Sequence, residues 1–78
     1  MLIDIRDSYS YQKGHLEGAV SIPSFSLMKN PEQYLDKEKT YTLYCQSGVK
    51  SKRVVSFLNA LGYHCVNLEG GYSKHLFL

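Results

Sequence analysis

Residues 42–53 carry the most informative pattern of the chain: Thr42-Leu43-Tyr44-Cys45-Gln46-Ser47-Gly48-Val49-Lys50-Ser51-Lys52-Arg53. An apolar run ends at Cys45, and a short polar loop that contains Gly48 follows it. Apolar side chains then recur at helical spacing, at Val54, Phe57, Leu58 and Leu61. The pattern predicts a strand, a tight loop and a helix, with the cysteine between the strand and the first helical turn.

A cysteine in this position meets unpaired backbone N–H groups and the positive end of a helix dipole. Such surroundings stabilise a thiolate and can bind an anion beside it. Lys50, Lys52 and Arg53 add positive charge at the helix start, where the dipole favours negative charge. The alternative is that the three cations are solvated surface charges and Cys45 is a small buried residue at a strand end. Because the cysteine, the glycine loop and the cations occur together, we favour a functional site.

Length and composition limit the class of protein. The chain has 78 residues, so we expect residues 1–78 to form a single domain with a modest core. A hydrophobic fraction of 44% and a charged fraction of 21% are ordinary for a globular protein. The net charge of +2 is too small to indicate a nucleic-acid partner. No apolar run approaches the roughly 20 residues of a membrane helix, so no membrane partner is expected either.

Cysteine usage and the N-terminus bear on location and cofactors. Two cysteines, Cys45 and Cys65, are not the pattern of a disulfide-stapled secreted domain. Asp4 and Arg6 interrupt the first apolar residues, so no signal peptide is recognisable and a cytoplasmic location is the default expectation. Neither C-x-x-C nor H-x-x-x-H spacing occurs, and we therefore expect no metal site and no cofactor.

Apolar and β-branched runs predict four short strands, at residues 2–5, 19–22, 41–44 and 65–68. Helical segments are expected between and after them, at residues 9–13, in two short pieces within 24–35, at 51–61 and within 72–78. Strands that alternate with helices predict a parallel sheet in an α/β domain. Ligands in such sheets bind at the carboxyl ends of the strands, where Cys45 and Arg6 both lie.

Four residues outside the cysteine loop also invite an interpretation. Asp4 and Arg6 point to the same face of the first strand, and a buried Asp4 needs a partner, either Arg6 or another group at that strand end. His15 beside a glycine is more typical of a residue that braces a loop than of a catalytic one. Cys65 begins its strand, about 13 Å from the level of Cys45 at ~3.3 Å per residue, so we expect a buried apolar residue and no disulfide.

Four segments together resemble the rhodanese-like sulfurtransferases. Leu2-Ile3-Asp4-Ile5-Arg6 is similar to the Asp-x-Arg strand of that family. Gly14-His15-Leu16-Glu17-Gly18-Ala19-Val20-Ser21-Ile22-Pro23 is similar to its Gly-His-x-x-Gly-Ala-x-x-Ile-Pro segment. Cys45-Gln46-Ser47-Gly48-Val49-Lys50-Ser51 resembles its active-site loop, and Leu68-Glu69-Gly70-Gly71 its late Gly-Gly turn. The four segments occur in the order of the family and span nearly the whole chain.

The resemblance implies a three-layer fold with a mostly parallel central sheet flanked by helices. It also implies that Cys45 is the nucleophile and carries a persulfide between two half-reactions. The substrate-binding loop would consist of Gln46, Ser47, Gly48, Val49, Lys50 and Ser51, with the N–H groups of Gln46 to Lys50 around the sulfur. Asp4, Arg6 and Arg53 would support it. The implied partners are a small anionic sulfur donor such as thiosulfate and an acceptor that is cyanide, a thiol or a protein.

Some features depart from the family pattern. The family usually has a further strand and helix before the Asp-x-Arg strand, and Met1 stands in their place, so the chain resembles a short or N-terminally truncated member. His75 stands about where the family often has a tryptophan, and a closing helix often continues beyond residue 78. Because Met1 stands in place of the family's preceding strand, one sheet edge is expected to be uncovered. We expect low stability or self-association, for example as a homodimer.

Two other functions are compatible with parts of this sequence pattern. A cysteine phosphatase also attacks an anion from a helix start, but it needs an arginine six residues after the cysteine, a position that Ser51 occupies here. A non-catalytic or partner-dependent interaction module is the stronger alternative. The presence of Cys45 argues against it, because inactive members of the family typically lose this cysteine.

Overall fold

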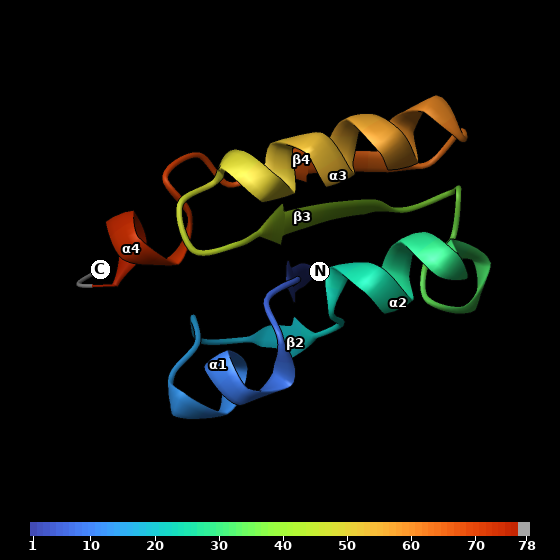
Figure 1. The fold of residues 1–78 in the computed structure, drawn as a ribbon. Coiled ribbons are helices and arrows are strands. Elements are labelled where there is room, and N and C mark those ends of the chain that lie inside the picture. Colours follow the sequence, from blue (N-terminus) through green and yellow to red (C-terminus); the bar gives the residue numbers. More distant parts are fainter. Residues whose placement is uncertain (77–78) are drawn as a thin grey trace.

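The computed structural model describes residues 1–76 and is built around one four-stranded sheet (Figure 1). Its strands are β1 (Leu2–Asp4), β2 (Ala19–Ser21), β3 (Thr40–Tyr44) and β4 (His64–Asn67). The strand order is β2-β1-β3-β4, and every pair of neighbours is parallel. The predicted parallel α/β sheet is therefore confirmed.

Helical segments lie between the strands and after the last one. They are α1 (Ser8–Lys13), α2 (Ser24–Lys29), a 3-10 turn η1 (Pro31–Gln33), α3 (Val49–Ala60) and α4 (Gly71–His75). Asp7 caps α1 by accepting the N–H of Ser10 at 2.9 Å. Asn30 precedes η1 without a side-chain cap.

Two predicted helices differ in extent from α3 and α4 in the structure. Helix α3 starts at Val49, two residues before the predicted start at Ser51, because the left-handed Gly48 lets the chain enter the helix directly from the loop. The last predicted segment, 72–78, corresponds to α4 up to His75, and residues 77–78 lie outside the described part of the chain.

The core lies between one face of the sheet and helices α2 and α3. Ile3 and Leu43 pair across β1 and β3, point to this face and are fully buried. Leu27 of α2 and Leu58 of α3 are also fully buried in the same apolar cluster. The opposite face is less covered, since Val66 of β4 remains 51% exposed there.

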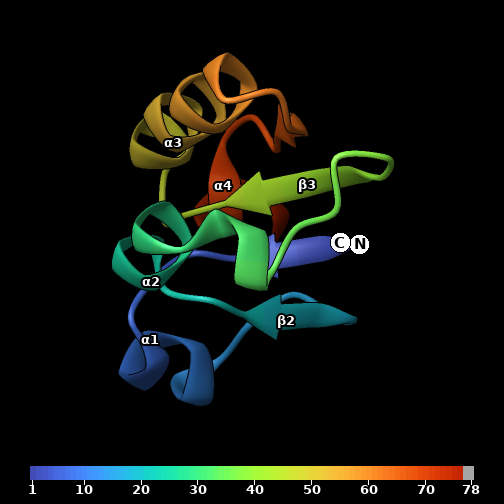
Figure 2. The same cartoon turned by 90° about the vertical axis from the view of Figure 1, so that its right-hand side faces the viewer.

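All strands point their carboxyl ends in one direction, and Figure 2 shows the arrowheads of β2 and β3 aimed at the same side of the molecule. The segment after β1, the β3–α3 loop and the turn before α4 meet at this side. Open parallel sheets bind ligands at such an end. The fold therefore brings together the segments that the sequence marked as candidates.

Candidate active site

Cys45 follows β3 directly, and its sulfur accepts main-chain N–H groups at the N-terminus of helix α3. The N–H groups of Gly48 and Ser51 both donate to Sγ at 3.2 Å. Gly48 is the left-handed N-cap residue of α3 and has no side chain to accept these groups. Because the first N–H groups of a helix have no partner within the helix, the sulfur takes the place of a capping oxygen.

The surroundings of Cys45 favour its ionised form. Burial by itself would raise the pKa of the thiol, since only 4% of the residue is exposed. Hydrogen bonds from Ser51, Gly48 and Ser47 outweigh burial, and the pKa is lowered from its ordinary value. Ser51 lies just beyond the Gln46 to Lys50 range that the sequence had suggested for the N–H donors.

Cys65 provides the contrast within the same chain. It lies on β4 opposite Tyr41, four residues before Cys45, and both cysteines are free. Burial raises the pKa of the Cys65 thiol, and no opposing interaction lowers it. Its predicted role as a buried apolar residue without a disulfide is confirmed.

The Gly-Gly turn fits against the cysteine loop through close backbone contact. A Cβ atom on Gly71 would clash with the main-chain oxygen of Cys45, and one on Gly48 would lie 2.9 Å from the nitrogen of Gly70. Tyr72 donates its N–H to the Cys45 oxygen at 2.9 Å. Glycine is needed here because any side chain would push the loop that holds the sulfur away from α4.

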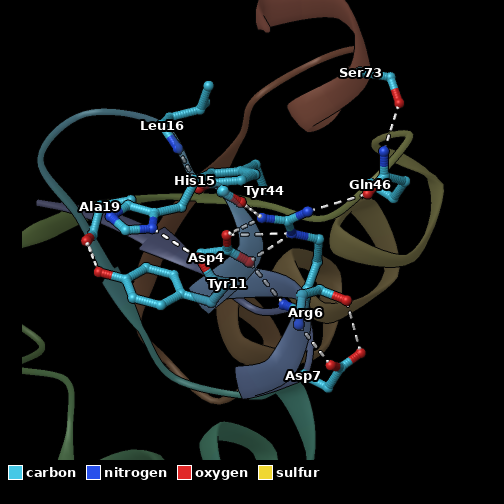
Figure 3. Close-up of polar contacts among 12 residues, drawn as sticks. Asp4, Arg6, Asp7, Tyr11, His15, Leu16, Ala19, Tyr44, Gln46 and Ser73 are labelled. Atoms are coloured by element: carbon cyan, nitrogen blue, oxygen red, sulfur yellow. Dashed lines mark hydrogen bonds and ion pairs between the residues drawn. The ribbon is translucent and has the colours of Figure 1, made fainter.

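Asp4 and Arg6 form the ion pair that was one of the two expectations for Asp4 (Figure 3). Asp4 is fully buried at the end of β1, and Nη2 of Arg6 lies 2.8 Å from its Oδ2. The N–H of Arg6 donates to Oδ1 as well, at 2.9 Å. The side-chain bonds to Asp4 raise the pKa of the Arg6 guanidinium above its ordinary value, and burial acts in the opposite direction.

The Arg6 guanidinium also joins three other segments. It donates to the main-chain oxygen of Gly14 at 2.7 Å and to Oε1 of Gln46 at 3.1 Å, and it lies over the ring of Tyr72, 4.1 Å from the ring centre. Gln46 in turn donates to the Ser73 hydroxyl, as the dashed line at the right of Figure 3 shows. Arg6 thus positions the cysteine loop and is not free to bind substrate with all its N–H groups.

The loop that contains His15 is braced as expected. Nδ1 of His15 lies 2.8 Å from the main-chain oxygen of Tyr11, and the two rings stack with centres 3.7 Å apart. The hydroxyl of the buried Tyr44 accepts the N–H of Leu16 at 3.0 Å (Figure 3). His15 is absent from the residues that line the cavity beside Cys45.

A cavity of about 370 Å³ opens beside the thiol. Of the expected site residues, it is lined by Cys45, Gln46, Ser47, Lys50 and Arg6. Lys52 and Arg53 are exposed on α3 and do not line it, so Lys50 is the cation that α3 contributes. A second cavity of about 290 Å³ adjoins along Arg6 and Ser10 and reaches Lys13, Gly14 and Tyr72.

Asp7 and Ser10 also line the cavity, although neither was among the expected site residues. The bonds from the Ser10 N–H and hydroxyl lower the pKa of Asp7, so a carboxylate faces the same space as Lys50. Their position just after the carboxyl end of β1 was the signal that could have marked them. A further cavity of about 350 Å³ lies at the opposite end of the sheet, around Tyr63 and Cys65, away from these groups.

Within the described residues, neither a metal-binding cluster nor a helix long and apolar enough to span a membrane is found. Within residues 1–76, no three or more histidine, cysteine, aspartate or glutamate side chains gather where they could hold a metal ion. In the same part of the chain, every helix falls short of the length and apolar character that a membrane span requires.

Comparison with known proteins matches these features to one family. A family model described as "Rhodanese-like domain" matches residues 1–76. "Putative sulfurtransferase YtwF" of Bacillus subtilis (strain 168) is 37% identical over 70 residues, which are 90% of this chain and 67% of that protein. A "tRNA uridine(34) hydroxylase" of Buchnera aphidicola subsp. Acyrthosiphon pisum (strain Tuc7) is 31% identical over 91% of this chain.

A solved structure has a similar fold and a sequence identity in the same range. The crystal structure of SSP1007 from Staphylococcus saprophyticus subsp. saprophyticus superposes with a TM-score of 0.86 and 33% sequence identity. The match covers 94% of this chain and 72% of that one. The chain spans about two thirds of the Bacillus relative but only 24% of the Buchnera hydroxylase.

Proposed function

Because the chain belongs to the rhodanese-like domain family, we propose that it is a sulfurtransferase in which Cys45 carries sulfur as a persulfide. The observation that carries the proposal is the pair of N–H bonds, from Gly48 and Ser51, to the Cys45 sulfur. A thiolate is the nucleophilic form of cysteine, and these donors favour it. The Bacillus relative, named as a putative sulfurtransferase, supports the same reaction class.

The first half-reaction takes a sulfane sulfur from thiosulfate or from another persulfide. The Cys45 thiolate attacks the outer sulfur of thiosulfate, the S–S bond of the donor breaks, and sulfite leaves with the electron pair. Lys50 draws the anionic donor into the cavity, since its charge is the one that α3 presents there. The persulfide that remains on Cys45 keeps both sulfur atoms at the helix N-terminus.

The second half-reaction returns the thiolate. An acceptor, which is cyanide, a small thiol or a thiol on a protein, attacks the outer sulfur of the persulfide. The S–S bond to Cys45 breaks, and its electron pair stays on the Cys45 sulfur, where the N–H groups of Gly48 and Ser51 accommodate the charge. No external oxidant or reductant is needed, because in each step the transferred sulfur forms one new bond to the attacking atom while its S–S bond to the leaving group breaks.

A phosphatase is disfavoured by the geometry of the loop. Phosphate chemistry of this type uses a planar arginine fork, and Ser51 occupies the required position with a buried hydroxyl that bonds to Asn67. A non-catalytic interaction module is the second candidate. An interaction module would not require the lowered pKa of the Cys45 thiol. The activity assay described next also tests this candidate.

The experiment is thiocyanate formation from thiosulfate and cyanide by the purified chain. We expect turnover in the wild type and in Cys65→Ser, and none in Cys45→Ser, because only Cys45 has N–H donors at its sulfur. Absence of turnover with thiosulfate and with a low-molecular-weight persulfide would favour the interaction module. Hydrolysis of a phosphate ester without sulfur transfer would favour the phosphatase.

A further inference from the structure

Asn67 joins strand β4 to both residues that hold the Cys45 sulfur. Its Nδ2 donates to the main-chain oxygen of Gly48 at 3.1 Å, and its Oδ1 accepts the hydroxyl of Ser51. Gly48 and Ser51 are the residues whose N–H groups donate to Sγ. One side chain outside the loop is therefore bonded to both donor residues.

The position of Asn67 is set by the sheet and not by the loop. Asn67 pairs with Leu43 across β4 and β3, so its side chain points to the face on which α3 packs. The N–H of Leu68, the next residue, donates to the Leu43 oxygen at 2.9 Å and fixes the end of the strand. A group anchored on paired strands is a more rigid support than a group on the loop itself.

The bonding pattern also fixes which group donates to which. The Gly48 oxygen can only accept, so the amide must present Nδ2 to it and leave Oδ1 facing Ser51. A hydroxyl has a single proton, and in this arrangement the Ser51 proton goes to Asn67. The main-chain N–H groups then remain as the donors to the sulfur, and their directions depend on how Gly48 and Ser51 are held.

We propose that Asn67 is a positioning residue for sulfur transfer, which holds Gly48 and Ser51 so that both N–H groups point at the Cys45 sulfur. The proposal rests on the proposed role of Cys45 as the nucleophile. Asn67 acts through the two donors and does not touch the sulfur. The charged groups that line the cavity beside the thiol are Arg6, Asp7 and Lys50, and none of them bonds to Asn67.

The test is Asn67→Leu, which keeps the branching of the side chain and removes both bonds. Asn59→Leu is the matched control, because Asn59 also bonds two main-chain groups, the N–H and oxygen of Cys65, far from the loop. The readout is the rate of Cys45 alkylation by iodoacetamide against pH, measured by peptide mass spectrometry. Asn67→Ser, too short to reach both partners, serves if the leucine variant does not fold.

In Asn67→Leu we expect the pH midpoint of alkylation to rise and the rate at pH 7 to fall about threefold to tenfold, because one aligned donor to a charged group is lost. Asn59→Leu is expected to lose stability and keep the wild-type midpoint. An unchanged midpoint in the Asn67 variants would overturn the proposal. So would a lowered midpoint, since it would mean that the freed Ser51 hydroxyl donates to the sulfur instead.

Sulfur uptake separates this proposal from the proposed function. If the wild type takes up sulfur while Asn67→Leu keeps the wild-type midpoint and uptake, the positioning role fails and the sulfurtransferase stands. If the Asn67 variants shift the midpoint but the wild type takes up no sulfur from any donor, Asn67 still positions the two N–H donors at the Cys45 sulfur, and the sulfurtransferase fails.

Discussion

At the scale of single residues, two largely buried cysteines differ in the groups that surround their thiols. The sulfur of Cys45 accepts two main-chain N–H groups at the start of a twelve-residue helix, whereas burial is the single influence on the Cys65 thiol. Hydrogen bonds to a charged form outweigh desolvation only where they are several and aligned. The loop therefore favours the thiolate form of Cys45 through main-chain N–H groups.

This contrast predicts a pH dependence. The pKa of Cys45 is lowered, so its thiolate persists below the ordinary titration range of a thiol, and it becomes protonated only as the pH falls through the lowered pKa. The pKa of Cys65 is raised, so that thiol stays protonated at neutral pH. At pH 7 we expect iodoacetamide to label Cys45 at least about tenfold faster than Cys65. Equal labelling rates in the folded protein would contradict this.

A second residue-scale prediction concerns the glycines. Gly71 and Gly18 both have positive φ, at 60° and 83°, but only Gly71 has backbone atoms where a Cβ would be placed. Gly18→Ala is expected to cost about 1–2 kcal/mol for the left-handed conformation. Gly71→Ala should cost about 2 kcal/mol more, because the added carbon meets the Cys45 oxygen. Urea unfolding measures both, and equal losses would refute the close-contact explanation.

The sequence identified Cys45 and the Gly-Gly turn because each is a local pattern. It left the partner of Asp4 open, since a buried carboxylate requires a partner but the sequence does not show which residue supplies it. It missed Asp7 as a cavity residue and Asn67 as a support for the loop. Both reach the site only through sheet pairing and helix packing, which no spacing along the chain encodes.

At the scale of elements, Arg6 connects β1, the loop before β2 and the start of the β3–α3 loop. Its guanidinium is bonded to Asp4, Gly14 and Gln46 at once. The Arg6 side chain is 8% exposed and that of Asp4 is 0% exposed, so neither charge is compensated by bulk water. The ion pair therefore orients the elements that carry the site.

We accordingly expect Arg6→Met to lower the free energy of unfolding by about 3 kcal/mol, because Asp4 would stay buried without its partner. Combining it with Asp4→Asn should restore part of the loss. A double-mutant cycle by urea unfolding measures the coupling between the two residues. A double variant whose loss equals the sum of the two single losses would mean that the pair is not coupled.

The element pattern could be predicted in type, and helix and strand bounds agreed within a few residues. The start of α3 was placed two residues late because Val49 and Lys50 resemble loop residues until the left-handed Gly48 is known. The strand order β2-β1-β3-β4 had no counterpart in the sequence-based expectations. Strand order depends on contacts between distant segments, and only the pairing itself reveals it.

At the scale of the whole molecule, the sheet has two edges, β2 and β4, within the described residues. Val20 on β2 and Val66 on β4 are 41% and 51% exposed. Uncovered edge strands with apolar side chains are templates for pairing with another chain. A core of this size also leaves a small margin of stability.

We therefore expect a thermal midpoint below about 65 °C at low protein concentration, or a midpoint that rises with concentration as copies associate. Val66→Lys should weaken any association, because a charged lysine on an edge strand opposes pairing. Analytical ultracentrifugation of both proteins measures the oligomeric state. A cooperative melt above about 65 °C that does not depend on concentration would contradict the expectation.

The most direct measurement is the intact mass of the chain after incubation with thiosulfate and removal of excess donor. We predict that the wild type and Cys65→Ser gain the mass of one sulfur atom, that cyanide removes this gain, and that Cys45→Ser shows none. A wild-type mass that stays unchanged with thiosulfate and with a low-molecular-weight persulfide would contradict a persulfide on Cys45. A gain retained in Cys45→Ser would likewise contradict it, since the sulfur would then be bound elsewhere.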